Sequence, residues 1–315
     1  EHYGPIHPEI GVKHALLSNI AINESEYDMA LDYNNRSTAI YKEIYPDNHH
    51  EIILNYSTKG IIFNNLNQYD SAEYYLKKSL QMASVKFGRS HPYNVGTLNI
   101  LARLDYIKGN TNEAKSKLLE AFEIAKSNYS VKSHQAITSL TNLSQFFSGL
   151  GQFDSAAYYI KEANAVAGLV YGDYHPRIAY QLFIEGTILR NAKKYEQAIA
   201  SYKKSIKLYD TLFNEPTQEI VRVKLDCAMT YTDLNDTETA LRIISDLKEQ
   251  VLENDTTFTY RQADINSILG QTLVAQKKYK KAKNVLSANI DSLHLHFPEK
   301  SRMIAYNERI LAEIP

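Results

Sequence analysis

Histidine is the residue type whose spacing in this 315-residue chain first suggests chemistry, because neutral imidazole binds metals and titrates near neutral pH. The recurring histidines are His7, His49, His91 and His175, at intervals of 42, 42 and 84 residues. A metal ion needs several ligands around one point, and histidines that belong to separate repeating units cannot converge there. We therefore interpret them as packing and capping residues at helix starts.

Other reactive side chains also lack partners with suitable spacing. The pairs His49-His50 and His294-x-His296 have no third ligand nearby. Cys227 is the only cysteine, so no internal disulfide can form. It stands beside small apolar residues, and no histidine or acid is tied to it by spacing, so we interpret it as a buried packing residue. Glu308 and Glu313 fall on a helix face that we expect to be solvated.

No segment carries a Gly-rich phosphate loop, a nucleophile elbow or a metalloprotease helix. The sequence therefore predicts no catalysis, no metal and no cofactor in this chain. Lys plus Arg is 35 and Asp plus Glu is 36, which gives no electrostatic case for nucleic acid or an anionic membrane. No apolar run approaches the roughly 20 residues that a membrane helix needs.

The single cysteine fits a reducing compartment, and we expect a cytoplasmic location. The composition, rich in Asn, Ile, Lys and Tyr and without Trp, suggests a bacterial source. The chain does not begin with Met, and we expect it to be part of a longer protein.

An internal repeat of 42 residues must position all of these side chains. One column is alanine in every unit: Ala30, Ala72, Ala114, Ala156, Ala198, Ala240 and Ala282. A second column, twelve residues earlier, holds only small residues: Ser18, Gly60, Ala102, Ser144, Gly186, Ala228, Gly270 and, one period on, Ala312. An aromatic column opens the units: Tyr3, Tyr45, Phe87, Tyr129, Tyr171, Phe213 and Phe297, interrupted at Asp255.

Apolar residues recur at helical spacing on both sides of a short break within each unit, as in 137–147 and 155–167. The break carries Gly151, whose slot elsewhere holds Ser25, Asn67, Gly109, Lys193, Asn235 and Lys277. Gly and Asn favour a left-handed helix C-cap, and the Pro of each "HP" suits the first turn of the next helix. Each unit is therefore predicted to be a helix hairpin whose two helices approach most closely at the small columns.

One hairpin cannot bury its apolar face alone, so the units must stack. The predicted fold is an all-α solenoid of seven repeats and a C-terminal helix, forming a single domain over residues 1–315. The repeats span 3–44, 45–86, 87–128, 129–170, 171–212, 213–254 and 255–296, and the terminal helix spans 297–315.

The spacing inside each unit resembles the tetratricopeptide repeat (TPR) signature: a small residue, an Ala twelve later, and an aromatic three before that Ala. The 42-residue period, the "YG..HP" junction and the stretch "TLNILARLDYIKGNTNEA" (97–114) resemble the kinesin light chain type. This resemblance implies a TPR superhelix. It extends to repeats in bacterial CHAT proteins, whose C-terminal domain is a caspase-like protease.

The resemblance further implies that the first helix of each hairpin lines a concave groove. Three positions per unit would then point inward: three before, one after and four after the small residue. They are Asn99, Arg103 and Tyr106; Thr141, Gln145 and Ser148; Phe183, Thr187 and Arg190; and Leu225, Met229 and Thr232, with Tyr180 and Arg222 one turn earlier. The predicted partner-binding residues are Asn99, Arg103, Tyr106, Gln145, Tyr180, Phe183, Arg190, Arg222 and Met229. The alternative is that some of these side chains pack between neighbouring first helices.

Light-chain grooves use a recurring asparagine at the first inward position to clamp peptide backbone, and only Asn99 retains it. The other units have Ala15, Ser57, Thr141, Phe183, Leu225, Ser267 and Arg309 there.

Three functions stay open. The first is a non-catalytic scaffold that binds a protein or peptide segment in its groove. The second is a regulatory arm of a larger enzyme such as a CHAT protease, with a linked downstream domain. The third is a receptor for a signalling peptide.

Overall fold

The computed structural model describes residues 4, 6–24, 26–213, 217–254, 260–296 and 301–315, and their regular structure is entirely helical. The helices are α1 (Pro8–Asn23), α2 (Tyr27–Ile44), α3 (His50–Asn65), α4 (Tyr69–Phe87), α5 (Tyr93–Ile107), α6 (Thr111–Tyr129), α7 (His134–Gly149), α8 (Phe153–Tyr171), α9 (Pro176–Asn191), α10 (Tyr195–Leu212), α11 (Gln218–Asp233), α12 (Thr237–Asn254), α13 (Tyr260–Ala275), α14 (Tyr279–His296) and α15 (Ser301–Ala312). The predicted all-α class is confirmed.

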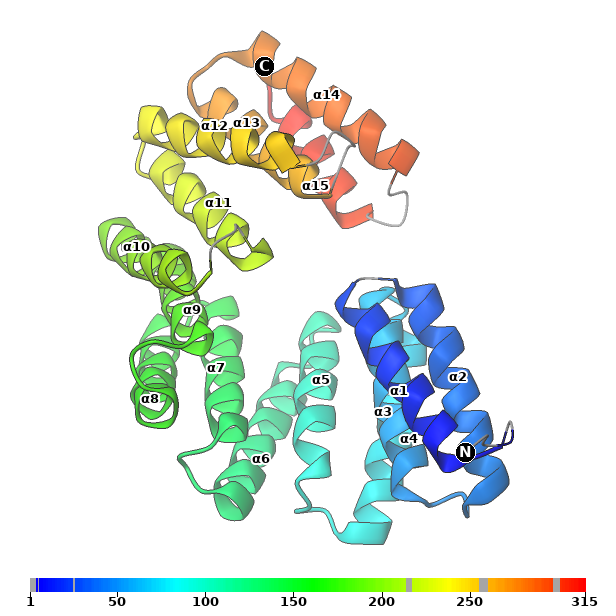
Figure 1. Ribbon diagram of the computed structural model, residues 1–315. Helices are drawn as coiled ribbons and strands as arrows, with labels where there is room; N and C mark the ends of the chain where they lie inside the picture. Colours follow the sequence, from blue (N-terminus) through cyan, green and yellow to red (C-terminus); the bar gives the residue numbers. More distant parts are fainter. Residues whose placement is uncertain (1–3, 5, 25, 214–216, 255–259, 297–300) are drawn as a thin grey trace. The chain divides into compact units, whose positions relative to one another are not determined.

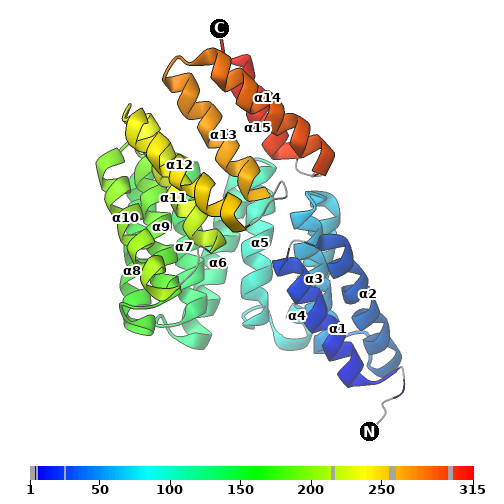
Figure 2. The same cartoon turned by 45° about the horizontal axis from the view of Figure 1, so that its top comes forward.

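Consecutive helices form hairpins. The pairs α1/α2, α3/α4 and α5/α6 lie side by side in one part of the chain, and α9/α10, α11/α12 and α13/α14 in another (Figures 1 and 2). The contacts divide the chain into two compact units, residues 1–146 and 147–315, and the division falls inside α7. Within each unit the hairpins stack as an α-solenoid. The single-domain organisation and the repeat boundaries stay predictions.

The two small columns meet at the helix crossing of each hairpin. All seven column alanines are completely buried. The Ser18 hydroxyl donates to the Ala30 carbonyl oxygen at 2.8 Å, which joins the two columns directly. A Cβ on Gly186 would lie 2.6 Å from the Tyr202 ring. Close approach therefore explains why these positions are small. Ala312, in α15, is exposed.

The helix ends follow the predicted chemistry. Asn67, Gly109, Gly151, Lys193, Asn235 and Lys277 have φ between 59° and 83°, the left-handed conformation expected after a helix. The Gln68 N–H donates to the Phe63 carbonyl oxygen at 2.9 Å, which is the long bond of a Schellman motif. Only the slot of Ser25 lies outside the described residues.

The histidine column caps the first helices. Nδ1 of His7, His49, His91 and His175 accepts the backbone N–H two residues later, at 3.0 to 3.5 Å. The junction aromatic stacks on the same ring, with centroids 3.7 Å apart for Tyr45–His49 and 4.4 Å for Tyr171–His175. The repeated "YG..HP" junction is thus a structural cap. Tyr3, Asp255 and Phe297 of the aromatic column lie outside the described residues.

Candidate functional site

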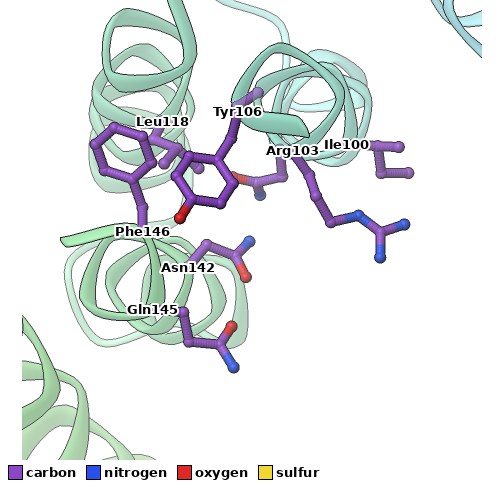
Figure 3. Close-up of a pocket in the computed structure, with 9 residues that line it drawn as sticks. Ile100, Arg103, Tyr106, Leu118, Asn142, Gln145 and Phe146 are labelled. Atoms are coloured by element: carbon purple, nitrogen blue, oxygen red, sulfur yellow. The ribbon is translucent and has the colours of Figure 1, made fainter. Parts of the chain in front are cut away.

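A cavity of about 440 Å³ opens between the first helices α5 and α7 within residues 1–146 (Figure 3). Four predicted partner-binding residues line it together: Asn99, Arg103 and Tyr106 from α5 and Gln145 from α7. Its other lining residues are Ile100, Ala102, Leu118, Asn142 and Phe146. The 42-residue spacing of two first helices therefore brings inward positions of neighbouring repeats to one hollow.

Arg103 is the only charged residue in the lining of this cavity. It forms no hydrogen bond or ion pair with any described residue, and its side chain extends away from the Tyr106 and Phe146 rings (Figure 3). The nearest acid in sequence, Asp105, already pairs with Lys117, with Oδ2 and Nζ 2.6 Å apart. The residue is exposed, yet the surrounding protein displaces enough water to lower the pKa of the Arg103 guanidinium below its usual value. The site thus holds one uncompensated positive charge.

The remaining lining offers aromatic surface and amides. The Tyr106 and Phe146 rings meet edge to face, with centroids 5.7 Å apart and an interplanar angle of 71°. The Asn99 Oδ1 atom is buried and accepts no hydrogen bond in the structure. A buried acceptor without a donor carries a desolvation cost of about 1–3 kcal/mol. A ligand N–H that reached Asn99 would remove that cost.

Several other inward positions are closed by packing. Thr141, Ser148, Leu225 and Thr232 are buried. The Thr232 hydroxyl bonds the Thr272 hydroxyl of α13 at 3.0 Å, so it joins neighbouring first helices instead of facing an open surface. For these positions the packing alternative is the observed one.

Three predicted residues gather on α9 and α11 in residues 147–315. Phe183 is only 4% exposed, its ring centroid lies 6.3 Å from that of Tyr180, and the Arg222 guanidinium lies 5.3 Å above it. Tyr180 and Arg222 are exposed. Phe183 therefore packs beneath them, and only Tyr180 and Arg222 offer surface to a partner.

Arg190 is already paired. Its Nε donates to Asp233 Oδ2 at 2.7 Å, which links α9 to α11. Burial acts to lower the pKa of Arg190, but the Asp233 carboxylate outweighs it and the pKa is raised. Met229, on the same helix as Asp233, is half-buried. The structure thus gives Arg190 a stabilising role and leaves less of its charge for a ligand.

Asp226 lies on α11, between Arg222 and Asp233 in the sequence. Burial raises the pKa of its carboxyl, and the charges of Arg222 and Arg190 only partly oppose this. The three inward positions predicted for each unit did not include Asp226, Asp233, Asn142 or Phe146. All four lie on first helices, so a wider helical face would have included them, but the sequence does not tell an open position from a covered one.

The described residues contain no cluster of three or more His, Cys, Asp or Glu side chains able to hold a metal ion. Cys227 is buried, and burial raises the pKa of its thiol to about 11, as expected for a packing cysteine. Among the helices of the described segments, none combines the length and apolar character needed to cross a bilayer.

Two tetratricopeptide repeat family models match the chain, at residues 56–93 and 182–211. A clustered mitochondria protein homolog from Brugia malayi is 23% identical over 220 residues, which are 69% of this chain and 15% of that relative. The chain thus spans about a seventh of that relative's length.

Solved structures share the fold at low sequence identity. NprR in complex with its cognate peptide NprX matches with a TM-score of 0.61 and 16% identity, over 96% of this chain and 87% of NprR. The TPR-like repeats of a protein assigned as a kinesin light chain in Podosopora anserina match with a TM-score of 0.52 and 14% identity, over 65% of this chain and 98% of that one. These matches confirm the repeat type that the spacing predicted.

Proposed function

The chain carries tetratricopeptide repeats in an α-solenoid fold, and from this premise we propose that it is a non-catalytic scaffold that binds a protein segment along its first helices. The observation that carries the proposal is the cavity between α5 and α7. It combines an uncompensated cation, Arg103, with a buried acceptor that lacks a donor, Asn99 Oδ1. Arg103 favours a ligand that carries a negative charge, and Asn99 favours a ligand that carries a hydrogen-bond donor.

An extended peptide with an acidic side chain matches these groups. Its carboxylate would pair with Arg103, and a backbone N–H would donate to Asn99. Apolar atoms of the same segment would pack on the Tyr106 and Phe146 rings, and Gln145 would hydrogen-bond its backbone. A charge-assisted hydrogen bond contributes about 1.5–3 kcal/mol, so the Arg103 contact would change affinity about ten- to a hundredfold.

The test is selection of displayed random peptides on the immobilised chain, followed by calorimetry of the enriched peptides. We expect saturable binding and enrichment of Asp or Glu. Arg103→Gln should weaken those peptides about tenfold or more, and Arg103→Glu should select basic residues instead. Arg36→Gln is the matched control, because Arg36 is also an exposed arginine in residues 1–146 and pairs with Asp32 on α2, outside the cavity lining.

The absence of any saturable peptide would reject the scaffold proposal. Saturable peptides with equal affinity for the wild type and Arg103→Gln would keep a scaffold but reject this cavity as its site. Neither Arg103→Gln nor Arg103→Glu removes a hydrogen bond or ion pair with a described residue, so a change in folding is not expected to obscure the result.

The fold likeness to NprR with its bound peptide favours a second candidate, a receptor for a short signalling peptide. Free peptides alone would then bind tightly and shift the unfolding temperature, whereas a scaffold would prefer the segment within a larger protein. A regulatory arm of a CHAT-type enzyme and a bacterial source stay predictions.

A further inference from the structure

A cluster of lysines lies away from the cavity, on helices α2, α3 and α4. Lys78 of α4 places its ammonium 4.4 Å from the centroid of the Tyr56 ring, and Lys42 of α2 lies 5.9 Å from the same centroid. Tyr56, on α3, is only 7% exposed. Two helices of neighbouring hairpins thus direct their lysines to one fixed ring.

The cluster extends along α3. The Tyr75 ring stacks on Tyr56 with centroids 6.0 Å apart, and the Lys59 ammonium lies 4.7 Å from the Tyr75 centroid. Lys59 donates to the neutral Asn35 Oδ1 at 2.7 Å. None of the three lysines has an ion pair with a carboxylate among the described residues. The ion pairs of α4 belong instead to Glu73 and Asp70, which hold Lys77 and Lys108.

The pKa of Tyr56 agrees with the closeness of the two lysines to its ring. Burial acts to raise the pKa of Tyr56, but hydrogen bonding and charge from Lys78 and Lys42 outweigh it, so the pKa lies below its usual value. The polar groups that act most on Lys78 are the phenols of Tyr56, Tyr74 and Tyr75, with no carboxylate among them. The whole chain is nearly neutral, so this surface is a local excess of positive charge.

We propose that Lys42, Lys78 and the Tyr56 hydroxyl form a binding site for a phosphate group. Two ammonium groups and a phenol provide several donors around one point, which suits the three oxygens of a phosphate monoester. Its charge of about −2 would balance both lysines, while a carboxylate would balance one. The buried Tyr56 ring fixes the floor of the site, and Lys59 adds a third positive charge beside it.

This site lies on different residues from the cavity between α5 and α7 and does not depend on the scaffold proposal. Calorimetry with inorganic phosphate and with O-phosphoserine would separate a free ion from a phosphorylated side chain. Sodium chloride of equal ionic strength is the reference for both titrations. We expect saturable binding of at least one probe, and binding about tenfold or more weaker in Lys42→Met/Lys78→Met.

Lys77→Met is the matched control, since Lys77 is an exposed lysine next to Lys78 that pairs with Glu73. It should leave phosphate binding unchanged. A second readout is the phenol titration of Tyr56 by NMR, because bound phosphate should shield the lysine charges and raise the pKa of Tyr56. Equal binding by the wild type and the double variant, or a response no larger than that to chloride, would overturn the site.

Discussion

Two aspartates on α11 have opposite energetic roles at the scale of single residues. Asp233 pairs with Arg190, whereas Asp226 is partly buried and its pKa is raised by that burial. Asp233→Asn should lower the free energy of unfolding by about 1–3 kcal/mol, because it leaves Arg190 without its partner. Asp226→Asn should raise the unfolding temperature at pH 7, because it removes a charge that the folded state disfavours. Thermal unfolding of both variants gives the comparison.

The pH dependence of the Asp226 effect follows from its sign. A raised folded pKa means that the folded state holds the proton more tightly than the unfolded chain, so the Asp226 contribution to stability declines as pH rises above about 3.8. The advantage of Asp226→Asn should therefore shrink as pH falls toward that value. A variant less stable than the wild type at pH 7 would show that Arg222 and Arg190 outweigh the burial.

At the scale of the helices, two glycines allow the effect of side-chain packing on stability to be measured apart from the effect of helix propensity. A Cβ on Gly186 would lie 2.6 Å from Tyr202 Cε1, whereas a Cβ on Gly96 would meet nothing within 4 Å. Gly96→Ala should stabilise the chain by about 0.5–1 kcal/mol through helix propensity. Gly186→Ala should destabilise it by about 1–3 kcal/mol, because the Tyr202 ring must move. Equal effects in urea unfolding would contradict the close approach at the small column.

Stability should be regional at the scale of the whole molecule, because stacked repeats depend mainly on their neighbours. Leu98 is fully buried in a cluster formed by α4, α5, α6 and α7, and Leu286 in one formed by α13, α14 and α15. Each Leu→Ala substitution should cost about 2–5 kcal/mol. Hydrogen exchange should show lost protection in residues 69–136 for Leu98→Ala and in residues 260–296 and 301–314 for Leu286→Ala. Uniform loss along the chain in either variant would show global cooperativity instead.

The repeat, the helix hairpins, the small crossing residues and the caps could all be predicted from the amino-acid sequence. These features arise from local spacing and backbone preference, which each 42-residue unit repeats. His49 caps α3 and Asn67 ends it with the geometry that their residue types favour. The helical spacing also predicted the inward direction of four side chains that line one cavity in the structure: Asn99, Arg103, Tyr106 and Gln145.

Which inward positions are open depends on packing between repeats and could not be predicted from the sequence. Arg103 and Gln145 are exposed, but Phe183 lies beneath Arg222, and Arg190 is held by Asp233. A helical column gives the direction of a side chain, whereas its exposure and charge balance depend on the side chains that neighbouring repeats place around it. The convergence of Lys42 and Lys78 on Tyr56 has the same origin, because it joins three helices through contacts that no periodicity encodes.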